Sequence, residues 1–391
     1  MSHVALVIPG LDRIGGAERQ VMLLAKGLRR RDWRVSVVAL SGDGKHAASE
    51  LTDAGVEFLS LEMRKGLADP RGWIRYNRWL NREKPQVVHT HLPHASWLAR
   101  WSRLSTPVRV LVDTLHSSST GKLARRIGYR SSSWLPDQVT AVSQSVANAH
   151  FAARMVGRSQ LSVLPNGVDV EEFRPDANSR ADARRELGIN DEFLWLAVGR
   201  LEPVKDYPTL LRTFATVSEP ARLLIVGEGV QHHEMCLLSS HLGLEHRVRF
   251  LGFQPNVQRW LCAADGFVLS SKWEGLPVGL LEAGACALPS VATDVPGSRE
   301  VIVQGRTGSL VPCGSPSGLA SAMTAIMQST PQERQCMGNL ARLHVAERFS
   351  LEAMLDRWER LYAKLLRHHY QPSHGMHIQV EVRPPAGIAG D

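Results

Sequence analysis

Short apolar runs alternate with amphipathic segments along most of the chain, and this alternation predicts the fold class. Residues 4–8 form an apolar run, residues 10–16 a glycine-containing loop, and residues 17–30 a segment whose apolar side chains recur at helical spacing. A second apolar run follows at 35–40. A strand, a helix and a strand in this order make a βαβ unit with parallel strands. The beginning of the chain therefore predicts the start of a parallel sheet.

The same alternation continues through the first half of the chain and restarts in the second. A turn-forming stretch at 164–169 precedes a polar helix at 179–187, so we place a domain boundary there. Further strands are expected at 86–89, 109–115, 138–142, 193–199, 223–227, 248–253, 266–271, 290–293 and 305–311. Further helices are expected at 208–217, 231–242, 256–264, 316–328, 331–349 and 351–368.

These elements predict an α/β fold with two Rossmann-like, doubly wound βα domains that face a cleft. We expect a first domain at 1–168, a second at 169–350, a helix crossing back to the first domain at 351–370, and a flexible tail at 371–391. Ligands of parallel sheets gather outside the carboxyl ends of the strands. The cleft between the two domains is therefore the expected place for a site.

Composition adds constraints on compartment and cofactors. The five cysteines show no CxxC spacing and are odd in number, which disfavours a disulfide framework or a zinc site and fits a reducing cytosol. The apolar run near Met1 follows no basic segment, so we interpret it as a strand and not as a signal peptide. No 18 uncharged apolar residues occur in succession, and we expect no membrane span.

The net charge of +8 is concentrated in one part of the chain. Residues 60–135 contain 14 Lys and Arg against 4 Asp and Glu, interleaved with aromatic residues. Basic and aromatic residues together indicate an anionic membrane surface or an anionic acceptor. The alternative is a solvated basic face over core tryptophans, and we expect no nucleic-acid partner because no reader motif occurs. The aromatic residues are Trp73, Tyr76, Trp79, Trp97, Trp101 and Trp134.

Two glutamates eight positions apart mark the most informative stretch. Glu274 precedes Pro277, which suits the first turn of a helix, so Glu274 is expected in a loop and Glu282 on the helix's second turn. The free N–H groups and the positive dipole end of such a helix form an anion site. A phosphate between two hydroxyl-accepting carboxylates is the layout of a nucleotide sugar. The alternative is that Glu274 caps the helix while Glu282 is a solvated surface charge.

Polar residues at the expected strand ends suggest further contacts. The first loop lacks the dinucleotide fingerprint, but Gly15 and Gly16 place bare backbone at a helix start, where a phosphate or sugar can approach. A histidine group follows two expected strands, and all four members are expected to face the cleft. A metal is one reading, but no nearby carboxylate or cysteine completes a ligand set, so sugar or acceptor contacts are preferred. The histidines are His89, His91, His94 and His116.

Four sequence pieces, taken in order, resemble one family. They are Gly15-Gly16-Ala17-Glu18, Pro165-Asn166-Gly167-Val168-Asp169, Gly199-Arg200-Leu201-Glu202-Pro203-Val204-Lys205-Asp206, and Glu274 with Glu282. Together they are similar to the retaining glycosyltransferases of family 4, also called group 1, which have the GT-B fold. The resemblance covers about residues 3–368.

The resemblance implies roles by matching motif. Arg200 and Lys205 would hold the donor diphosphate, where fixed cations stabilise the charge that builds on the leaving phosphate. Glu282 would bind the ribose, Glu274 the hydroxyls of the donor sugar, and His116 the same sugar from the first domain.

The backbone positions of the donor site follow from the same resemblance. Gly15 and Gly16 would approach the phosphate, and a backbone cradle would surround it. The base would lie near Gly252 and Phe253, and near 227–228. The cradle is Gly275, Leu276, Pro277, Val278, Gly279 and Leu280.

The family further implies transfer with retention through front-face attack, without a metal or a cofactor, and no Asp-x-Asp motif occurs. One departure is the turn 297–300, which replaces a more usual double glycine and puts backbone contacts there in doubt. We expect transfer of a hexose or N-acetylhexosamine from a UDP-linked donor to a glycan or polyprenyl-linked acceptor. The expected location is cytoplasmic, at the inner face of the cytoplasmic membrane. Alternatives are a nucleotide-sugar epimerase of the same architecture and a non-catalytic nucleotide-sugar-binding subunit.

Overall fold

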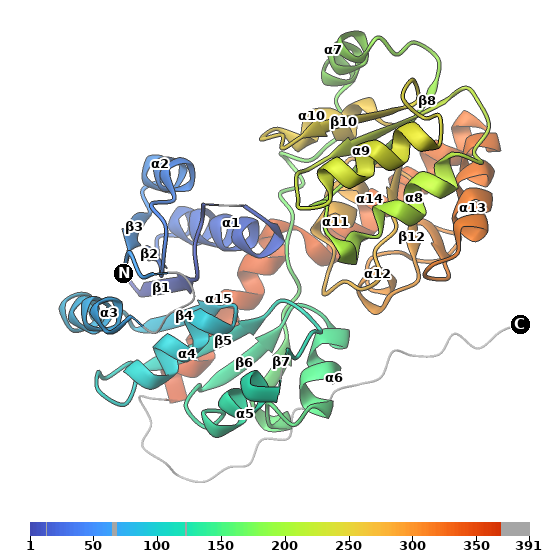
Figure 1. The fold of residues 1–391 in the computed structure, drawn as a ribbon. Helices are drawn as coiled ribbons and strands as arrows, with labels where there is room; N and C mark the ends of the chain where they lie inside the picture. Colours follow the sequence, from blue (N-terminus) through green and yellow to red (C-terminus); the bar gives the residue numbers. More distant parts are fainter. Residues whose placement is uncertain (13, 65–68, 122, 369–391) are drawn as a thin grey trace, which may run out of the picture.

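The computed structural model describes residues 1–12, 14–64, 69–121 and 123–368. Within these ranges the chain forms two parallel β-sheets, each flanked by helices, which make two bodies side by side (Figure 1). This arrangement confirms the predicted α/β class with two doubly wound domains. The tail expected at 371–391 lies outside the described residues.

The first sheet has seven strands in the order β3-β2-β1-β4-β5-β6-β7, and all neighbouring strands are parallel. Its strands are β1 (His3–Ile8), β2 (Arg34–Ala39), β3 (Glu57–Ser60), β4 (Val87–His91), β5 (Val110–Leu115), β6 (Gln138–Ala141) and β7 (Leu161–Val163). Its connecting helices are α1 (Gly16–Arg30), α2 (Lys45–Asp53), α3 (Pro70–Glu83), α4 (Pro93–Ser102), α5 (Leu123–Ser131) and α6 (Gln144–Ala152), with the short turn η1 (Arg158–Gln160).

The second sheet has six parallel strands in the order β10-β9-β8-β11-β12-β13. Its strands are β8 (Phe193–Val198), β9 (Ala221–Val226), β10 (Val248–Gly252), β11 (Gly266–Leu269), β12 (Ser290–Thr293) and β13 (Gly308–Val311). The helices of this body are α7 (Ala177–Leu187), α8 (Tyr207–Phe214), α9 (His232–His241), α10 (Val257–Ala263), α11 (Val278–Ala285), α12 (Pro296–Arg299), α13 (Pro316–Gln328) and α14 (Pro331–Phe349), with the turn η2 (Pro203–Lys205).

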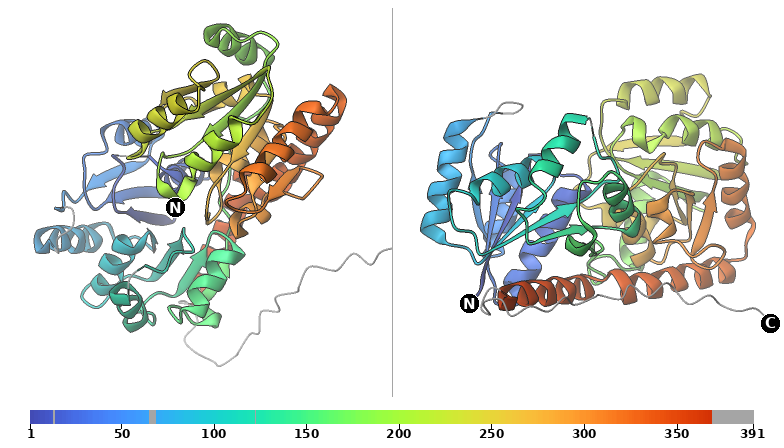
Figure 2. Two further views of the ribbon diagram at one scale, coloured as in Figure 1. Left: turned by 45° about the vertical axis from the view of Figure 1, so that its right-hand side comes forward. Right: turned by 90° about the horizontal axis from the view of Figure 1, so that it is seen from below.

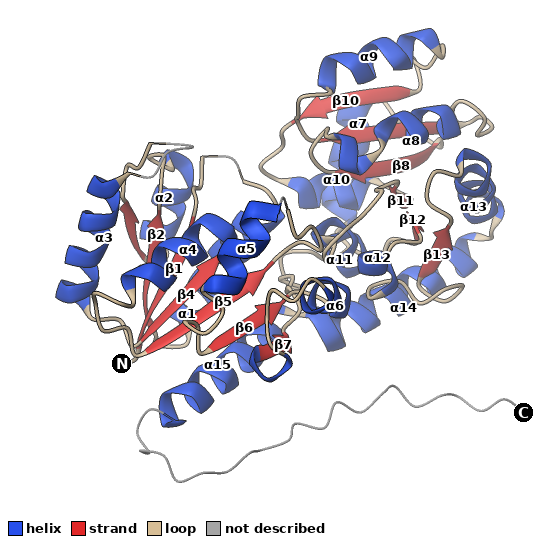
Figure 3. Cartoon of the chain, turned by 60° about the horizontal axis from the view of Figure 1, so that its bottom comes forward, coloured by secondary structure: helices blue, strands red, loops and turns tan. Residues whose placement is uncertain are grey.

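Alternate side chains of β1 belong to two different cores, as the pleat of a strand requires. Leu6 and Ile8 pack in the cluster that contains α1, whereas Ala5 and Val7 pack in the cluster that contains α3 and α4. The first sheet is therefore buried on both faces, with α1 on one side and the layer of α3 and α4 on the other (Figure 3).

The last described helix, α15 (Leu351–His368), follows α14 directly but packs against the first body. Its buried side chains recur at helical spacing, and Leu355, Trp358 and Tyr362 join the core formed by α1. At the end of α1, Arg31 contacts Glu359 of α15 at 2.6 Å. Figure 2 shows this helix running back along the underside of the first body.

The strand order reverses at β1/β4 in the first sheet and at β8/β11 in the second. A crevice forms at such a switch point, because neighbouring connections leave in opposite directions. The loops after these four strands therefore carry the candidate site.

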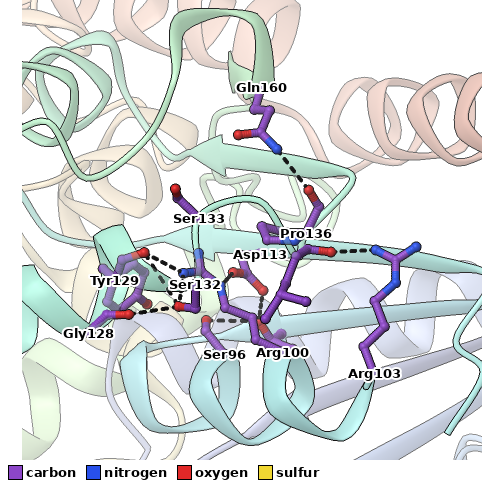
Figure 4. A network of polar contacts seen from close by, with 12 residues as sticks. Ser96, Arg100, Arg103, Asp113, Gly128, Tyr129, Ser132, Ser133, Pro136 and Gln160 are labelled. Atoms are coloured by element: carbon purple, nitrogen blue, oxygen red, sulfur yellow. Dashed lines mark hydrogen bonds and ion pairs between the residues drawn. The ribbon is translucent and has the colours of Figure 1, made fainter. Parts of the chain in front are cut away.

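A fully buried ion pair fixes the layer of α4 and α5 to the strand that leads into the site (Figure 4). Arg100 of α4 donates from Nε to Asp113 Oδ2 of β5 at 2.7 Å, and both side chains have no exposed surface. The guanidinium also donates to the Tyr129 carbonyl at 3.2 Å and to Ser132 Oγ at 2.9 Å. On the other side, Thr90 Oγ1 donates to Asp113 Oδ1 at 2.6 Å. The pair thus joins three segments behind β5.

Asp113→Asn is expected to destabilise the first domain by about 3–5 kcal/mol, because it leaves the Arg100 guanidinium buried without a counter-charge. Urea unfolding followed by tryptophan fluorescence measures this difference.

The matched control is Glu57→Gln, which removes the carboxylate from the partly exposed Arg34–Glu57 pair. That change should cost no more than about 1 kcal/mol. Equal losses in the two variants would contradict the assignment of the buried pair as an anchor of the domain.

Candidate active site

The loop after β1 brings bare backbone to the cleft. Gly15 precedes the first residue of α1, and its N–H donates to the Glu18 carboxylate at 3.0 Å. A Cβ on Gly16 would lie 3.6 Å from Val278 Cγ2, at the start of α11 in the second body, and a Cβ on Gly15 would lie 3.9 Å from Arg200 Nε. The start of α1 therefore faces the second domain at close range.

Glu274 lies in the loop between β11 and α11, as expected. Its Oε1 atom accepts hydrogen bonds from Lys205 Nζ at 2.5 Å and from Ser271 Oγ at 2.6 Å. The alternative that Glu274 caps the helix is wrong, because Pro277 holds the N-cap position and no side chain caps this helix. The loop instead places a carboxylate and a cation together at the helix start.

Glu282 lies on the second turn of α11 with 4% of its side chain exposed. The alternative of a solvated surface charge is therefore wrong. Its Oε1 atom accepts a hydrogen bond from Arg19 Nη1 of α1 at 2.5 Å. Burial raises the pKa of Glu282 above its ordinary value of 4.5, while the Arg19 guanidinium acts in the opposite direction.

The loop after β5 meets the same part of the second domain. A Cβ on Gly275 would lie 2.2 Å from the His116 carbonyl oxygen, which is far inside van der Waals contact. Only glycine allows this approach of two backbones. His116 is thereby placed beside Glu274 in the chain's three-dimensional arrangement, although the two positions are remote in sequence.

The His116 ring is held from the first domain. Its Nε2 lies 3.0 Å from His91 Nδ1 at the end of β4, and burial lowers the pKa of His116 to about 4. Burial also lowers the pKa of His91 well below its ordinary value. Both rings are therefore neutral near pH 7, so His116 can exchange a hydrogen bond with a hydroxyl without carrying charge.

The expectation that all four histidines face the cleft is wrong for His89. His89 is buried in the core, where Nδ1 contacts the Tyr362 hydroxyl at 2.7 Å and Nε2 contacts Thr114 Oγ1 at 2.6 Å. His94 is exposed on α4 and packs edge-on against Trp97. His89 and His91 are two positions apart on β4 and lie on the same face of the strand, with ring centroids 4.1 Å apart. His91 is nearer the end of the strand and therefore reaches His116. No group of three metal-ligating side chains occurs within the described ranges.

Arg200, the other cation of the expected diphosphate site, is more exposed than Lys205. Arg200 follows β8 and is 63% exposed, and its Nη1 atom donates to Glu202 Oε1 at 2.7 Å. Lys205 is more enclosed, with 20% of its side chain exposed. The two cations therefore border the cleft from one loop, at different depths.

Two of the expected cradle positions have no free backbone N–H group to offer a ligand. Pro277 has no N–H group, and the Leu280 N–H already donates to the Pro277 carbonyl at 3.1 Å. The N–H groups of Leu276, Val278 and Gly279 have no hydrogen-bond partner in the part of the chain that the structure describes. These three groups remain as donors for an anion at the start of α11.

The expected base-binding positions come together at the carboxyl ends of β9 and β10. The Gly227 N–H donates to the Gly252 carbonyl at 2.8 Å, and the Phe253 N–H donates to Glu228 Oε1 at 3.4 Å. Phe253 is 49% exposed. An exposed ring beside two glycines offers a planar surface at the outer end of the cleft.

The turn that departs from the usual double glycine makes contacts that the sequence left in doubt. A Cβ on Gly297 would lie 2.8 Å from the carbonyl oxygens of Glu274 and Gly275. At the end of this turn, Glu300 accepts hydrogen bonds from the backbone N–H groups of Gln144 and Ser145, both at 3.1 Å. A carboxylate of the second domain therefore caps α6 of the first.

Sequence reasoning missed Arg19 and assigned no role to Glu300. Arg19 directly follows the Gly15–Glu18 piece, so its place near the cleft was the available signal. No local pattern marks Glu300 as a partner of α6, because the contact joins residues 156 and 155 positions apart.

Comparison with known proteins agrees with this geometry. The model of glycosyltransferase family 4 matches residues 14–172, and that of glycosyl transferases group 1 matches residues 179–344. Among described residues no helix is long and apolar enough to cross a membrane.

Curated relatives match over most of their length. The chain is 31% identical over 303 residues to N-acetyl-alpha-D-glucosaminyl L-malate synthase of Bacillus anthracis, which covers 73% of this chain and 76% of the relative. It is 24% identical over 317 residues to UDP-Gal:alpha-D-GlcNAc-diphosphoundecaprenol alpha-1,3-galactosyltransferase of Escherichia coli, covering 77% and 81%.

A solved structure shows the same arrangement of domains. HepE of Anabaena in complex with UDP and glucose superposes with a TM-score of 0.84 at 20% identity, over 93% of this chain and all of that one. Two family models in tandem, a relative above 30% identity and this common architecture lead to one conclusion: the chain belongs to the family 4 (group 1) glycosyltransferases and has the GT-B fold.

Proposed function

We propose that this chain is a retaining glycosyltransferase that moves a hexose or N-acetylhexosamine from a UDP-linked donor to a lipid-linked glycan in cell-surface polysaccharide synthesis. The observation that carries the proposal is the contact of Lys205 Nζ with Glu274 Oε1 at 2.5 Å, at the start of α11 and opposite the loop that carries His116. Cation, carboxylate and helix terminus are the groups that a sugar phosphate needs.

The donor is placed along the cleft by the chemistry of its parts. The diphosphate lies between Gly16 and the N–H groups at the start of α11, with Arg200 and Lys205 beside it. The donor sugar lies between Glu274 and His116. Ribose hydroxyls lie on Glu282, and the base lies near Gly252 and Phe253.

The reaction is a substitution at the anomeric carbon on one face of the sugar. The acceptor hydroxyl oxygen forms the new bond to that carbon while the bond from the carbon to the donor phosphate oxygen breaks. The hydroxyl proton passes to the leaving phosphate, so the products are a glycoside and a nucleoside diphosphate. Lys205 and Arg200 stabilise the charge on the leaving group. Glu274 holds sugar hydroxyls and is not assigned as a nucleophile.

Two comparisons support the choice of donor and acceptor. The E. coli relative is named for a UDP-galactose donor and a diphosphoundecaprenol-linked acceptor, and the Anabaena structure contains UDP. We propose no cofactor and no metal requirement, because Arg200 and Lys205 supply the positive charge beside the phosphate.

An exposed apolar and basic face on the first domain suits a lipid-linked acceptor. Tyr76 and Trp79 are buried, so part of the aromatic set belongs to the core, as the alternative interpretation required. The remaining apolar side chains lie on or beside α3, α4, α5 and α6, which follow one face of the first sheet. They are Trp73, Ile74, Trp101, Leu104, Leu123, Ile127, Trp134 and Phe151.

Basic residues accompany this face. A surface hollow of about 430 Å³ is lined by Arg130 and Arg154 together with Phe151, and neither arginine has an acidic partner within the described ranges. Tryptophan beside arginine suits the boundary between lipid headgroups and acyl chains. We therefore propose that the enzyme is cytoplasmic and binds the inner face of the cytoplasmic membrane through this face.

Lys205→Ala or Glu274→Ala is expected to lower the transfer rate by at least about 100-fold, because each removes a group that binds the transferring sugar phosphate. UDP release from a panel of UDP sugars with an acceptor extract measures the rate, after thermal shift has identified the sugar that stabilises the protein. Both variants should keep the wild-type circular dichroism spectrum.

The control is Lys26→Ala, which removes the cation of an exposed Lys–Glu pair with the same 2.5 Å separation. It should turn over like the wild type. Undiminished turnover in Lys205→Ala or Glu274→Ala would refute the assignment, and epimerised UDP-N-acetylglucosamine in the absence of acceptor would favour the isomerase alternative.

The protein should sediment with anionic lipid vesicles at about 50 mM salt and dissociate at about 500 mM salt, because salt screens the attraction of arginine to the surface. Trp101→Ser combined with Trp134→Ser should weaken binding by at least about 10-fold. Leu237→Ser, at an exposed position of α9 in the second domain, is the control and should bind normally. Equal sedimentation of all three proteins would rule out this face.

A further inference from the structure

One ion pair crosses the cleft between the two domains. Arg19 is on the first turn of α1, and Glu282 is on the second turn of α11. Their atoms Nη1 and Oε1 are 2.5 Å apart, with 33% of the arginine side chain and 4% of the glutamate side chain exposed. Among the ion pairs of the described ranges, the other that joins residues 1–168 to residues 169–350 is the 3.9 Å pair of Arg30 with Asp169 at the domain boundary.

The contact with Arg19 involves only one of the two carboxylate oxygens of Glu282. Arg19 occupies Oε1, while Oε2 has no hydrogen-bond partner in the described part of the chain. A carboxylate can accept about four hydrogen bonds when it is ionised, but a protonated carboxyl group turns one oxygen into a donor. An ionised Glu282 can therefore hold Arg19 and still accept hydrogen bonds from a pair of neighbouring hydroxyls.

Arg19 also sets the charge of Glu282. The groups that face this carboxylate are Arg19, Glu172 from the segment after the first domain, and Cys286 one turn along α11. Burial and Glu172 favour the neutral acid, and the guanidinium favours the carboxylate. Arg19 is thus the cation that opposes protonation of a buried acid.

We propose that Arg19 is a positioning residue of the donor site, which holds Glu282 oriented and ionised for the donor ribose from the opposite domain. The proposal rests on the proposed function, because it takes the ribose as the ligand of Glu282. It adds that the first domain takes part in nucleotide binding through α1.

The test uses the full chain and UDP alone as the probe, with binding measured by titration calorimetry from about pH 5.5 to about pH 8.5. Arg19→Ala should weaken UDP binding by about 10-fold to 100-fold and raise the KM of the sugar donor by a similar factor, with a smaller effect on kcat. Arg19→Lys should restore most of the affinity. Arg30→Ala, in the last turn of the same helix, is the control and should bind UDP normally.

The pH profile separates a role through Glu282 from a general structural role. Affinity is lost as pH falls through the pKa of Glu282, and without the guanidinium that pKa is higher. The loss should therefore begin at a higher pH in Arg19→Ala than in the wild type. In Glu282→Gln this pH dependence should be absent, and adding Arg19→Ala to it should cause no further loss.

The outcomes also separate this inference from the proposed function. Wild-type UDP binding together with unchanged binding by Arg19→Ala, or additive losses in the double variant, would overturn the role of Arg19 alone. A shift in melting temperature without any change in the pH profile of binding would also overturn it. Absence of binding of any nucleoside diphosphate by the wild type would overturn the proposed function, and this inference with it.

Discussion

The backbone of Gly275 and the carbonyl of His116 approach so closely that a single added carbon would lie 2.2 Å from the oxygen. This contact fixes how far the second sheet's loops reach into the first domain. Glu274 precedes the contact and Pro277 begins the helix just after it, so the carboxylate and the helix terminus are placed together. The structure of the candidate site depends on this approach, because a side chain at position 275 would separate the two halves of the cleft.

The charged side chains of the cleft form two cation–carboxylate pairs. Lys205 contacts Glu274 within the second domain, and Arg19 contacts Glu282 between the domains. Each carboxylate can keep its cation and still accept a hydrogen bond from a ligand hydroxyl, so its charge stays compensated when a ligand binds.

Periodicity predicted most of the fold because the sheets are parallel and buried on both faces. The helix at 331–349 and the strand at 290–293 have the expected bounds. The edge strands β3 and β7 were not predicted, since they are short and only partly buried and lack a continuous apolar run. Helix α12 also stood where the sequence indicated a turn, because four residues are too few to show a period.

In the candidate site, too, local features were predictable and contacts between remote segments were not. Positions within one motif, such as Glu274 in a loop and Glu282 on a helix, follow from proline, glycine and local spacing. Contacts between remote segments do not. Nothing near Arg19 or Glu300 reveals the other domain, and the burial of His89 depends on its contact with Tyr362 of α15. Tertiary contacts of this kind are set by the meeting of two sheets, which no local pattern encodes.

The position of α15 also determines when the core of the first domain can be completed during synthesis. The first sheet is made early, yet Trp358 and Tyr362 complete its core, and Tyr362 contacts His89 on the strand that carries His91. A nascent chain emerges from the ribosome with its N-terminal segment first. Until the last helix has emerged, the part of the core beside α1 that α15 completes stays exposed, and His89 beside His91 lacks its Tyr362 partner. The first domain in sequence is therefore the last to mature, and an unfinished chain leaves apolar surface for a chaperone to shield.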